Sequence, residues 1–469
     1  MDPSKFRVII VGGSVAGLVL AHCLHRASID HVVLEKGNNI APELGASIGI
    51  MPNGARILDQ LGLHEIIEQR IEPMSISQIT FPDGLALRSE YPQVIHERFG
   101  FPVAFLARTE FLKIAYEAYP EKAKILTGKR VTEVKRCLQG VCAVTDDGSV
   151  YVGSVIVGAD GVHSRIRSEI WRTASAYTPG FISDEEKKSM TVEYACVFGI
   201  SSGIKGLEAG EQVNAFLEKA AVMVVQGKDD VVFWFLFKKL DQKYVYPAVP
   251  RFSIDEAEKL CNRMKDVRLY QGLHIGDLWK NRVVASMTAL EEGLFKTWFY
   301  DRMVLLGDSV HKMTPNFGQG ANCAIEDAAT LASLIHKLLR ENPSHQPSSL
   351  QIRDTLQRYQ DIRYPRVKHI YDGSWTICRI HARDGLLLSL IGRYYTPWDT
   401  NLPANLASKA FADGETLDFL PLPVRPGQGW ARYSGKGKSG GWPYAVLFIL
   451  IALVVQGWVR YSDKLRYIQ

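Results

Sequence analysis

The fold is decided by Phe6–Val11, read FRVIIV, and by the turn that follows at once, Gly12–Gly17, read GGSVAG. Phe6–Val11 is an apolar run of strand length. Ala16–Ala27 has leucines at helical spacing, and His31–Leu34 (HVVL) is a second short strand. Strand, tight turn, helix and strand in quick succession form a βαβ unit. We therefore expect an α/β, Rossmann-like dinucleotide-binding fold at the N-terminus.

The turn departs at one position from the glycine pattern of a dinucleotide site. Such a site has glycine first for the turn, third for close approach of the pyrophosphate and sixth for helix packing. Gly12 and Gly17 fill the first and sixth positions, whereas Ser14 stands at the third. Glu35 ends the second strand, where a carboxylate accepts hydrogen bonds from an adenosine ribose and repels a 2′-phosphate. These residues predict a site for FAD or NAD rather than NADP.

Two later segments combine a strand with glycine and aspartate. Val157–Arg165 reads VGADGVHSR and contains Asp160, which belongs either to a cofactor site or to a simple turn before a helix. Leu305–His311 reads LLGDSVH and contains Gly307 and Asp308, the latter placed to bind polyol hydroxyls. A glycine-rich loop then leads to a long helix. Its dipole and free amides would stabilise an anion such as reduced flavin, and the amides belong to Gly320, Ala321 and Asn322.

Together these segments resemble the group A flavoprotein monooxygenases, in which all three meet FAD in this order. The resemblance implies that Glu35 binds the adenosine ribose, Asp308 the ribityl chain and Ala321 the isoalloxazine edge. It also implies that Arg108, before a helix, lies near the flavin, although a surface arginine capping that helix is the alternative. Gly49 matches a backbone contact to the cofactor. The expected cofactor-binding set is Gly12, Ser14, Gly17, Glu35, Gly49, Arg108, Asp160, Gly307, Asp308, Gly320, Ala321 and Asn322.

The runs GASIGIMPNGARILDQLGL, GADGVHSRIRSEIW and GDSVHKMTPNFGQGANCAIEDAA are similar to the fungal paxilline-type FAD epoxidases of indole-diterpene and meroterpenoid biosynthesis. This resemblance implies that NADPH, bound transiently, reduces FAD. Reaction with O2 would give a C4a-hydroperoxide that epoxidises an alkene of a farnesyl-like prenyl chain. The implied substrate is hydrophobic. Tyr194 and His311 are candidate proton donors, although a structural role is favoured for both.

Other functions remain to be compared with this one. An FAD-dependent aromatic ring hydroxylase would share every FAD motif and differ only in its substrate pocket. A flavin-dependent halogenase would resemble its own family's WxWxIP motif, which this sequence lacks. A non-enzymatic flavoprotein tethered to a membrane would need a partner surface.

The composition of the chain indicates which partners are excluded, and its sequence pattern indicates how the domains are arranged. The chain has 469 residues, a net charge of +5 and no basic stripe, which argues against nucleic acid as a partner. Its seven cysteines form no CxxC pair, so we expect neither a disulfide framework nor a metal site. The expected domains are an FAD-binding domain over 1–180, a mainly β substrate domain over 181–285, a return to the FAD-binding domain over 286–340, a helical region over 341–420 and a linker over 421–441.

The C-terminal segment Ser439–Val459 is uncharged and strongly apolar, with Trp442 and Trp458 at its edges. About twenty apolar residues span a hydrocarbon core as a helix, and tryptophan favours the membrane interface. This pattern predicts a transmembrane helix over 442–459, with a buried or membrane-surface helix as the alternative. It further predicts a single-pass protein of the endoplasmic reticulum with the membrane as partner and a cytosolic catalytic body.

Overall fold

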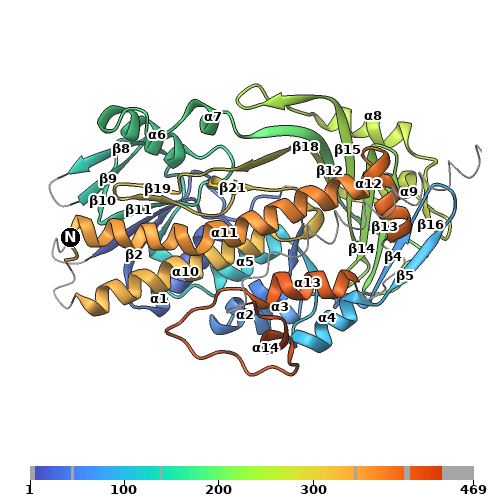
Figure 1. The fold of residues 1–469 in the computed structure, drawn as a ribbon, viewed down its shortest axis with the longest axis horizontal. Helices are drawn as coiled ribbons and strands as arrows, with labels where there is room; N and C mark the ends of the chain where they lie inside the picture. Colours follow the sequence, from blue (N-terminus) through green and yellow to red (C-terminus); the bar gives the residue numbers. More distant parts are fainter. Residues whose placement is uncertain (1–5, 44–46, 138–139, 343–345, 396–401, 436–469) are drawn as a thin grey trace, which may run out of the picture.

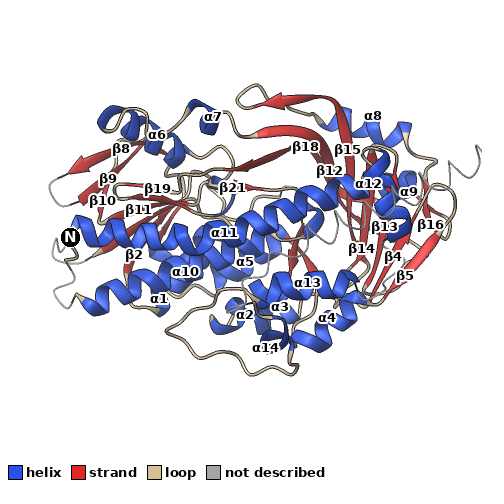
Figure 2. Ribbon diagram, in the orientation of Figure 1, coloured by secondary structure: helices blue, strands red, loops and turns tan. Residues whose placement is uncertain are grey.

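The computed structural model describes residues 6–43, 47–137, 140–342, 346–395 and 402–435 (Figure 1). Two large sheets form the two ends of an elongated molecule, and the helices α10 (Gly320–Glu341) and α11 (Ser349–His381) run along its centre (Figure 2). The long α11 contacts α10 and also β-strands of both sheets. The two sheets are therefore held together by a shared helical spine.

The first sheet has six strands, and all of its pairings except that of the edge strand β19 are parallel. Strand β1 lies near its centre, and helix α1 (Val15–Arg26) follows it directly, as the βαβ pattern predicts. Burial on both faces explains why these strands read as continuous apolar runs. In spatial order the strands are β19 (Phe299–Tyr300), β20 (Met303–Leu305), β11 (Val155–Gly158), β1 (Arg7–Val11), β2 (Asp30–Leu34) and β7 (Ile125–Leu126).

The second sheet has eight strands, and every pairing except β13 with β4 is antiparallel. One face packs on α8 (Ile254–Arg263) and α9 (Ile275–Lys280), which sequence patterning did not indicate. The opposite face carries a separate apolar cluster. In spatial order the strands are β21 (His311–Lys312), β18 (Arg282–Leu294), β12 (Thr191–Ser202), β15 (Val231–Val245), β14 (Ala220–Gln226), β13 (Glu211–Leu217), β4 (Ile76–Thr80) and β5 (Ala86–Ser89).

Smaller sheets and helices pack around the two large sheets. The structure confirms the predicted helical region toward the C-terminus. The small sheets are formed by β3 (Ser47–Ile50) with β6 (Ala104–Ala107), by β8 (Val131–Cys137), β9 (Gly140–Thr145) and β10 (Val150–Gly153), and by β16 (Arg268–Tyr270) with β17 (Leu273–His274). The remaining α-helices are α2 (Pro52–Gln60), α3 (His64–Glu68), α4 (Tyr91–Phe99), α5 (Arg108–Glu117), α6 (Arg165–Tyr177), α7 (Asp184–Lys187), α12 (Leu386–Leu390), α13 (Leu402–Ala412) and α14 (Gly429–Tyr433).

The transmembrane part of the predicted architecture requires correction. Within the described ranges, no helix is both long and apolar enough to cross a bilayer. The two longest helices, α10 and α11, carry charged side chains along their length and bury their apolar faces inside the protein. The predicted span, residues 442–459, lies outside the described residues. The prediction of a transmembrane helix, of a single-pass protein in the endoplasmic reticulum and of the membrane as partner therefore has no support in the described structure and is withdrawn.

Candidate cofactor and active site

The glycine-rich turn between β1 and α1 has no room for side chains at two positions. Gly12 has φ +108°, and a Cβ atom there would lie 2.4 Å from the carbonyl oxygen of Ala159. A Cβ atom at Gly17 would lie 1.9 Å from the carbonyl oxygen of Gly12. Glycine is therefore required at position 12 for the segment after β11 to pack against the turn, and at position 17 for α1 to approach the turn this closely.

Glu35 lies where β2 ends and is held against the turn. Its Oε2 accepts a hydrogen bond from the Gly13 amide at 2.7 Å, and its Oε1 accepts one from the Gly37 amide at 2.7 Å. Each carboxylate oxygen has a further lone pair for another donor. The carboxylate is thus fixed in place and keeps capacity to accept hydrogen bonds from ligand hydroxyls.

Ser14 and Arg108 form a pair at the first turn of α1. The Nη2 atom of Arg108 donates to the Ser14 hydroxyl at 2.8 Å, so the residue that departs from the glycine pattern supports the arginine. Arg108 Nη1 is buried and has no hydrogen-bond partner among the described residues. Burial lowers the pKa of Arg108, and this effect is opposed by the charges of Asp308 and Glu35. A buried guanidinium with a free donor is costly unless an anion meets it.

The Gly307–Asp308 turn follows β20 and begins a short 3₁₀ turn. Gly307 has φ +61°, and its amide donates to the Asp327 carboxylate at 2.9 Å. Asp308 forms an ion pair with Lys312, at 2.5 Å from Nζ to Oδ2. Burial acts to lower the pKa of Lys312, but the charge of Asp308 outweighs it and the pKa is raised. Sequence reasoning missed Lys312, since no local pattern distinguishes it from a surface lysine.

The N-terminus of α10 is tied to β3 by the side chain of Asn322. Its Nδ2 donates to the carbonyl oxygens of Gly49 at 2.9 Å and Gly318 at 2.8 Å, and its Oδ1 accepts from the Met51 amide at 3.1 Å. Gly320 and Ala321 form the first turn of the helix beside it. The structure thus brings Gly49, predicted from a distant segment, next to the predicted helix N-terminus.

Asp160 has a different set of contacts. Its Oδ2 accepts from the amides of Arg165 at 2.7 Å and Ile166 at 3.1 Å, and its Oδ1 accepts from the Ser164 hydroxyl at 2.5 Å. Burial raises the pKa of Asp160, an effect that these hydrogen bonds oppose. In this arrangement Asp160 caps helix α6.

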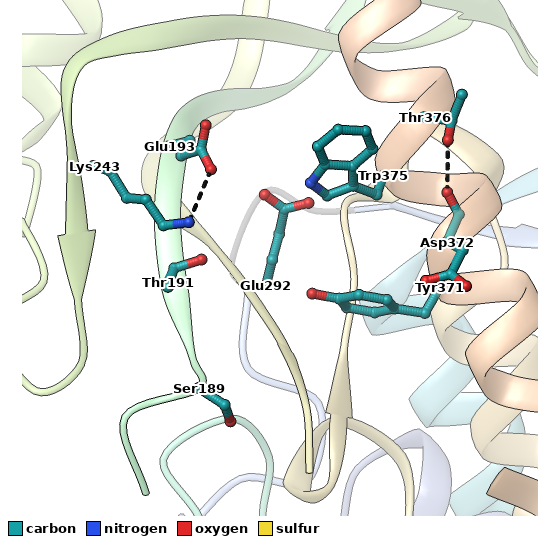
Figure 3. Close-up of a pocket in the computed structure, with 9 residues that line it drawn as sticks. All are labelled: Ser189, Thr191, Glu193, Lys243, Glu292, Tyr371, Asp372, Trp375 and Thr376. Carbon is teal, nitrogen blue, oxygen red and sulfur yellow. Dashed lines mark hydrogen bonds and ion pairs between the residues drawn. The ribbon is translucent and has the colours of Figure 1, made fainter. Parts of the chain in front are cut away.

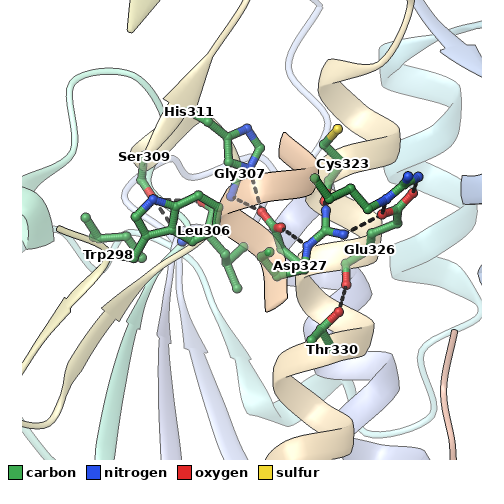
Figure 4. A network of polar contacts seen from close by, with 12 residues as sticks. Trp298, Leu306, Gly307, Ser309, His311, Cys323, Glu326, Asp327 and Thr330 are labelled. Carbon is green, nitrogen blue, oxygen red and sulfur yellow. Dashed lines mark hydrogen bonds and ion pairs between the residues drawn. The ribbon is translucent and has the colours of Figure 1, made fainter. Parts of the chain in front are cut away.

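The two candidate proton donors lie in the protein interior. Tyr194 on β12 is fully buried, and its hydroxyl donates to Asp384 at 2.7 Å, which also pairs with Lys239 at 2.6 Å. Burial, followed by this hydrogen bond, raises the pKa of Tyr194 above its ordinary range. His311 Nε2 lies 2.6 Å from the Asp327 carboxylate (Figure 4). His311 is not among the residues that line the cavity described next.

A cavity of ≈ 70 Å³ lies between the second sheet, the loop before α10 and α13. Its polar lining groups are Tyr91 and Gln212, joined by a hydrogen bond of 3.2 Å, and Asn316. The remaining lining residues are apolar or glycine: Met51, Val103, Phe105, Met223, Pro315, Phe317, Gly318, Ala407 and Phe411. Gly318 also contacts Asn322, so the cavity opens beside the N-terminus of α10.

A larger hollow of ≈ 500 Å³ lies between β12, the end of β15 and α11 (Figure 3). Its charges are paired within the protein. Glu193 lies 3.4 Å from Lys243, and Glu292 receives two hydrogen bonds of 2.9 Å from Arg379. Its lining residues are Ser189, Thr191, Glu193, Lys243, Glu292, Tyr371, Asp372, Trp375 and Thr376. The paired charges make this hollow less suited to an ionic cofactor than the turn at α1.

The residues around the glycine-rich turn, the Gly307–Asp308 turn and the N-terminus of α10 fit a flavin dinucleotide. The close backbone packing at Gly12 and Gly17 forms a tight turn that leads directly into α1, whose N-terminus suits a pyrophosphate, and the free donor of Arg108 suits the charge of that group. Glu35, Asp308 and the α10 N-terminus supply matching groups for ribose, polyol and an anionic ring. A Rossmann-like sheet with this set of groups defines an FAD-binding protein.

The comparisons with known proteins agree with this class. The model of the FAD binding domain family matches residues 5–193 and 258–374. FAD-dependent monooxygenase atmM of Aspergillus flavus is 50% identical over 452 residues, which cover 96% of this chain and 94% of that protein. FAD-dependent monooxygenase paxM of Penicillium paxilli is 49% identical over 455 residues, which cover 97% of this chain and 95% of that protein. The chain belongs to this family of FAD-dependent monooxygenases, as the sequence motifs predict.

A solved structure supports the fold. HpxO of Klebsiella pneumoniae, complexed with FAD and uric acid, matches with a TM-score of 0.71. Its sequence is 22% identical, and the match covers 87% of this chain and 97% of that one. At this level of identity the likeness concerns the fold alone.

Proposed function

We propose that this FAD-dependent monooxygenase epoxidises an alkene of a farnesyl-like prenyl chain in fungal terpenoid biosynthesis, with NADPH as a transiently bound reductant. The observation that carries the proposal is the chemistry of the ≈ 70 Å³ cavity. Tyr91 is its only ionisable lining group among the described residues, and burial raises the pKa of this phenol to about 12. The cavity therefore offers no general base at neutral pH.

The missing base favours an alkene over a phenol as the group that is oxidised. Bound FAD supplies the redox chemistry, taking electrons from NADPH and delivering one oxygen atom of O2. An alkene accepts that atom through its π electrons without losing a proton, whereas hydroxylation of a phenol is helped by removing one. The apolar walls also exclude water, which protects a reactive oxygen donor. Aromatic ring hydroxylation is therefore the second candidate.

The geometry of the site supports a proposed set of cofactor roles. We assign the adenosine ribose to Glu35, the pyrophosphate to Arg108 and Ser14, and the ribityl chain to Asp308. The flavin ring is assigned to the α10 N-terminus, between Gly49 and Ala321. We retain the division into an FAD-binding part over 1–180 and 286–340 and a substrate part over 181–285, with β4 and β5 of the larger sheet contributed from the first part.

The test is NADPH oxidation by the FAD-loaded protein, with and without a farnesylated phenol or a prenylated indole, followed by product mass and fragmentation. We expect substrate-stimulated oxidation and a product with one added oxygen on the prenyl chain. Oxygen on the aromatic ring would establish the hydroxylase instead. Flavin-loaded protein without substrate-stimulated turnover of either compound would contradict both.

A cavity variant links turnover to the proposed substrate site. Met223 lines the cavity and is 5% exposed. Met223→Trp fills the space and should lower turnover at least tenfold with FAD occupancy unchanged. Met223→Leu conserves volume and is the matched control, with near wild-type turnover. Equal turnover in the two variants would place the substrate elsewhere.

A further inference from the structure

Four charged side chains meet in the interior behind the Gly307–Asp308 turn. Figure 4 labels two of them, Glu326 and Asp327, beside Gly307. Glu326 and Asp327 come from α10, and Arg363 and Arg366 come from α11. Arg363 lies 2.5 Å from the Glu326 carboxylate and 2.8 Å from that of Asp327, while Arg366 lies 2.5 Å from Glu326. The side chains of Glu326, Asp327 and Arg363 are 0% exposed and that of Arg366 is 12% exposed.

The Asp327 half of this cluster contacts one proposed cofactor segment directly. Its carboxylate accepts the Gly307 amide at 2.9 Å and is 2.6 Å from His311 Nε2. These contacts fix the backbone of the turn that presents Asp308. His311, considered above as a proton donor, here holds the Asp327 carboxylate.

The Glu326 half reaches the N-terminus of α10. Glu326 accepts from Asn53 Nδ2 at 2.7 Å, and Asn53 in turn donates to Gln319 at 3.0 Å. Gln319 is the residue immediately before the first turn of α10. The cluster thus contacts both segments to which we assign the flavin end of FAD.

Both carboxylates of the cluster are ionised at neutral pH. Burial acts to raise the pKa of Glu326, but Arg366 and Arg363 outweigh it and lower the pKa to about 2. Burial is likewise outweighed at Asp327, where His311 and Arg363 lower the pKa to about 2. The cluster therefore holds two negative charges, which are opposed by the two arginines and, at Asp327, by His311.

The position of these charges matters because α10 is the proposed anion-stabilising helix. Glu326 lies six residues after Gly320, which is about 9 Å along the helix axis at about 1.5 Å per residue. Unbalanced carboxylates this close would oppose the positive N-terminal end of the helix dipole. The low polarity of the interior would strengthen that effect. The positive charges of Arg363 and Arg366 offset this effect of the two carboxylates on the helix N-terminus.

We propose that the balance between Arg363 and Arg366 on one side and Glu326 and Asp327 on the other sets the reduction potential of bound FAD. These four are positioning residues, because they act through the α10 N-terminus and the Gly307 turn. The inference rests on the cofactor site proposed above. Loss of a positive charge weakens binding of the anionic, reduced FAD and makes the potential more negative. Loss of a carboxylate has the opposite effect.

The experiment compares single charge changes in the FAD-loaded full chain. Arg366→Met and Glu326→Gln each alter the charge by one unit, in opposite directions. The midpoint potential of bound FAD is measured by reductive titration against a redox dye. We expect the ratio of the Kd values of reduced and oxidised FAD to change about tenfold, which corresponds to about 30 mV for a two-electron couple. The shift is negative for Arg366→Met and positive for Glu326→Gln.

Two controls separate electrostatic tuning from a merely structural role. The double variant Glu326→Gln/Arg366→Met restores the balance and should return to the wild-type potential. Arg172→Met removes an exposed arginine from α6, whose partner Glu169 keeps a second partner in Arg165, and should leave the potential unchanged. Shifts of the same sign in both single variants, or no shift in either, would overturn the inference.

The outcome also distinguishes this inference from the proposed cofactor site. Glu35→Ala with full flavin occupancy would remove the site itself and the inference with it. Weak flavin binding in Glu35→Ala, together with an unchanged potential in Arg366→Met, would support the proposed cofactor site. It would reject only the inference that the charge cluster sets the reduction potential.

Discussion

Glu35 is the single residue whose role depends most directly on its position at the end of β2. The two amide hydrogen bonds that hold its carboxylate leave it able to accept the hydroxyls of a ribose. Because hydrogen bonds to a charged group are among the stronger ones, Glu35→Ala should weaken FAD binding about a hundredfold. The flavin absorbance of the purified protein measures this loss. Glu117→Ala, an exposed position on α5, is the control and should retain flavin.

Arg108 and Ser14 make a second prediction at the residue scale. Arg108→Met removes the free guanidinium donor, and FAD binding should weaken by about 10–100-fold, as expected for loss of a hydrogen bond to a charged group. Ser14→Gly restores the glycine pattern but loses the 2.8 Å hydrogen bond to Arg108, so a smaller loss of severalfold is expected. Titration of the apoprotein with FAD gives both Kd values. Tighter binding in Ser14→Gly than in the wild type would contradict the supporting role of the serine.

At this scale the sequence indicates which residues lie close together only where the evidence is local. Gly12, Gly17 and Glu35 lie within one βαβ unit, so their spacing alone places them together. Lys312 and Arg363 gave no such signal. Arg363 on α11 meets Asp327 on α10, which is far away in the sequence. Lys312 meets Asp308 only four residues away, but the irregular turn that joins them has no sequence pattern that predicts the contact.

Helix α10 supports the main prediction at the scale of secondary-structure elements. Asn322 makes three hydrogen bonds that fasten its first turn to β3 and to the loop before it. Asn322→Leu removes all three and buries the groups left behind, so the free energy of unfolding should fall by about 3 kcal/mol. Thermal or urea unfolding of the holoprotein measures the change. Asn322→Leu with unchanged stability would show that β3 and α10 are held together by packing alone.

Elements with a strong local pattern were predicted well from the sequence. The βαβ unit and the long helix α10 were both expected from apolar periodicity. The sequence did not indicate that β4 and β5 join the sheet built mainly from residues 191–312, because strand pairing across such a distance leaves no local mark. Helix α14, inside the stretch expected as a linker, also escaped prediction because it has only five residues.

For the whole molecule, buried histidines predict the pH dependence of stability. Burial lowers the pKa of His31 and of His381 to about 4, from an ordinary value of 6.5, and it also lowers the pKa of His22. The unfolded chain therefore binds more protons than the folded one between about pH 6.5 and pH 4. Stability is complete above this window and is lost as the pH falls through it. Below it, Glu326 and Asp327, each with a pKa of about 2, extend the loss in the same direction.

Urea unfolding at several pH values between 7.5 and 4.5 tests this prediction. Each histidine of this kind contributes up to about 1.4 kcal/mol of stability per pH unit. His31→Gln should therefore show a shallower decline than the wild type, even if it is less stable at pH 7.5. If the free energy of unfolding fell equally steeply with pH in His31→Gln and in the wild type, His31 would not contribute to the pH dependence of stability.

The order of strands in the first sheet has a consequence for how the chain is made. Strand β1 pairs with β2 soon after both emerge from the ribosome, but its other neighbour, β11, begins at Val155, and β20 follows only at Met303. At about 5–20 residues per second, the N-terminal βαβ unit waits tens of seconds for the strands and the helix that complete its sheet. During that interval its apolar edge is open to chaperones and to other nascent chains. We therefore expect FAD to be loaded late in biosynthesis, because Gly307, Asp308 and the first turn of α10 are among the last of the proposed cofactor groups to be made.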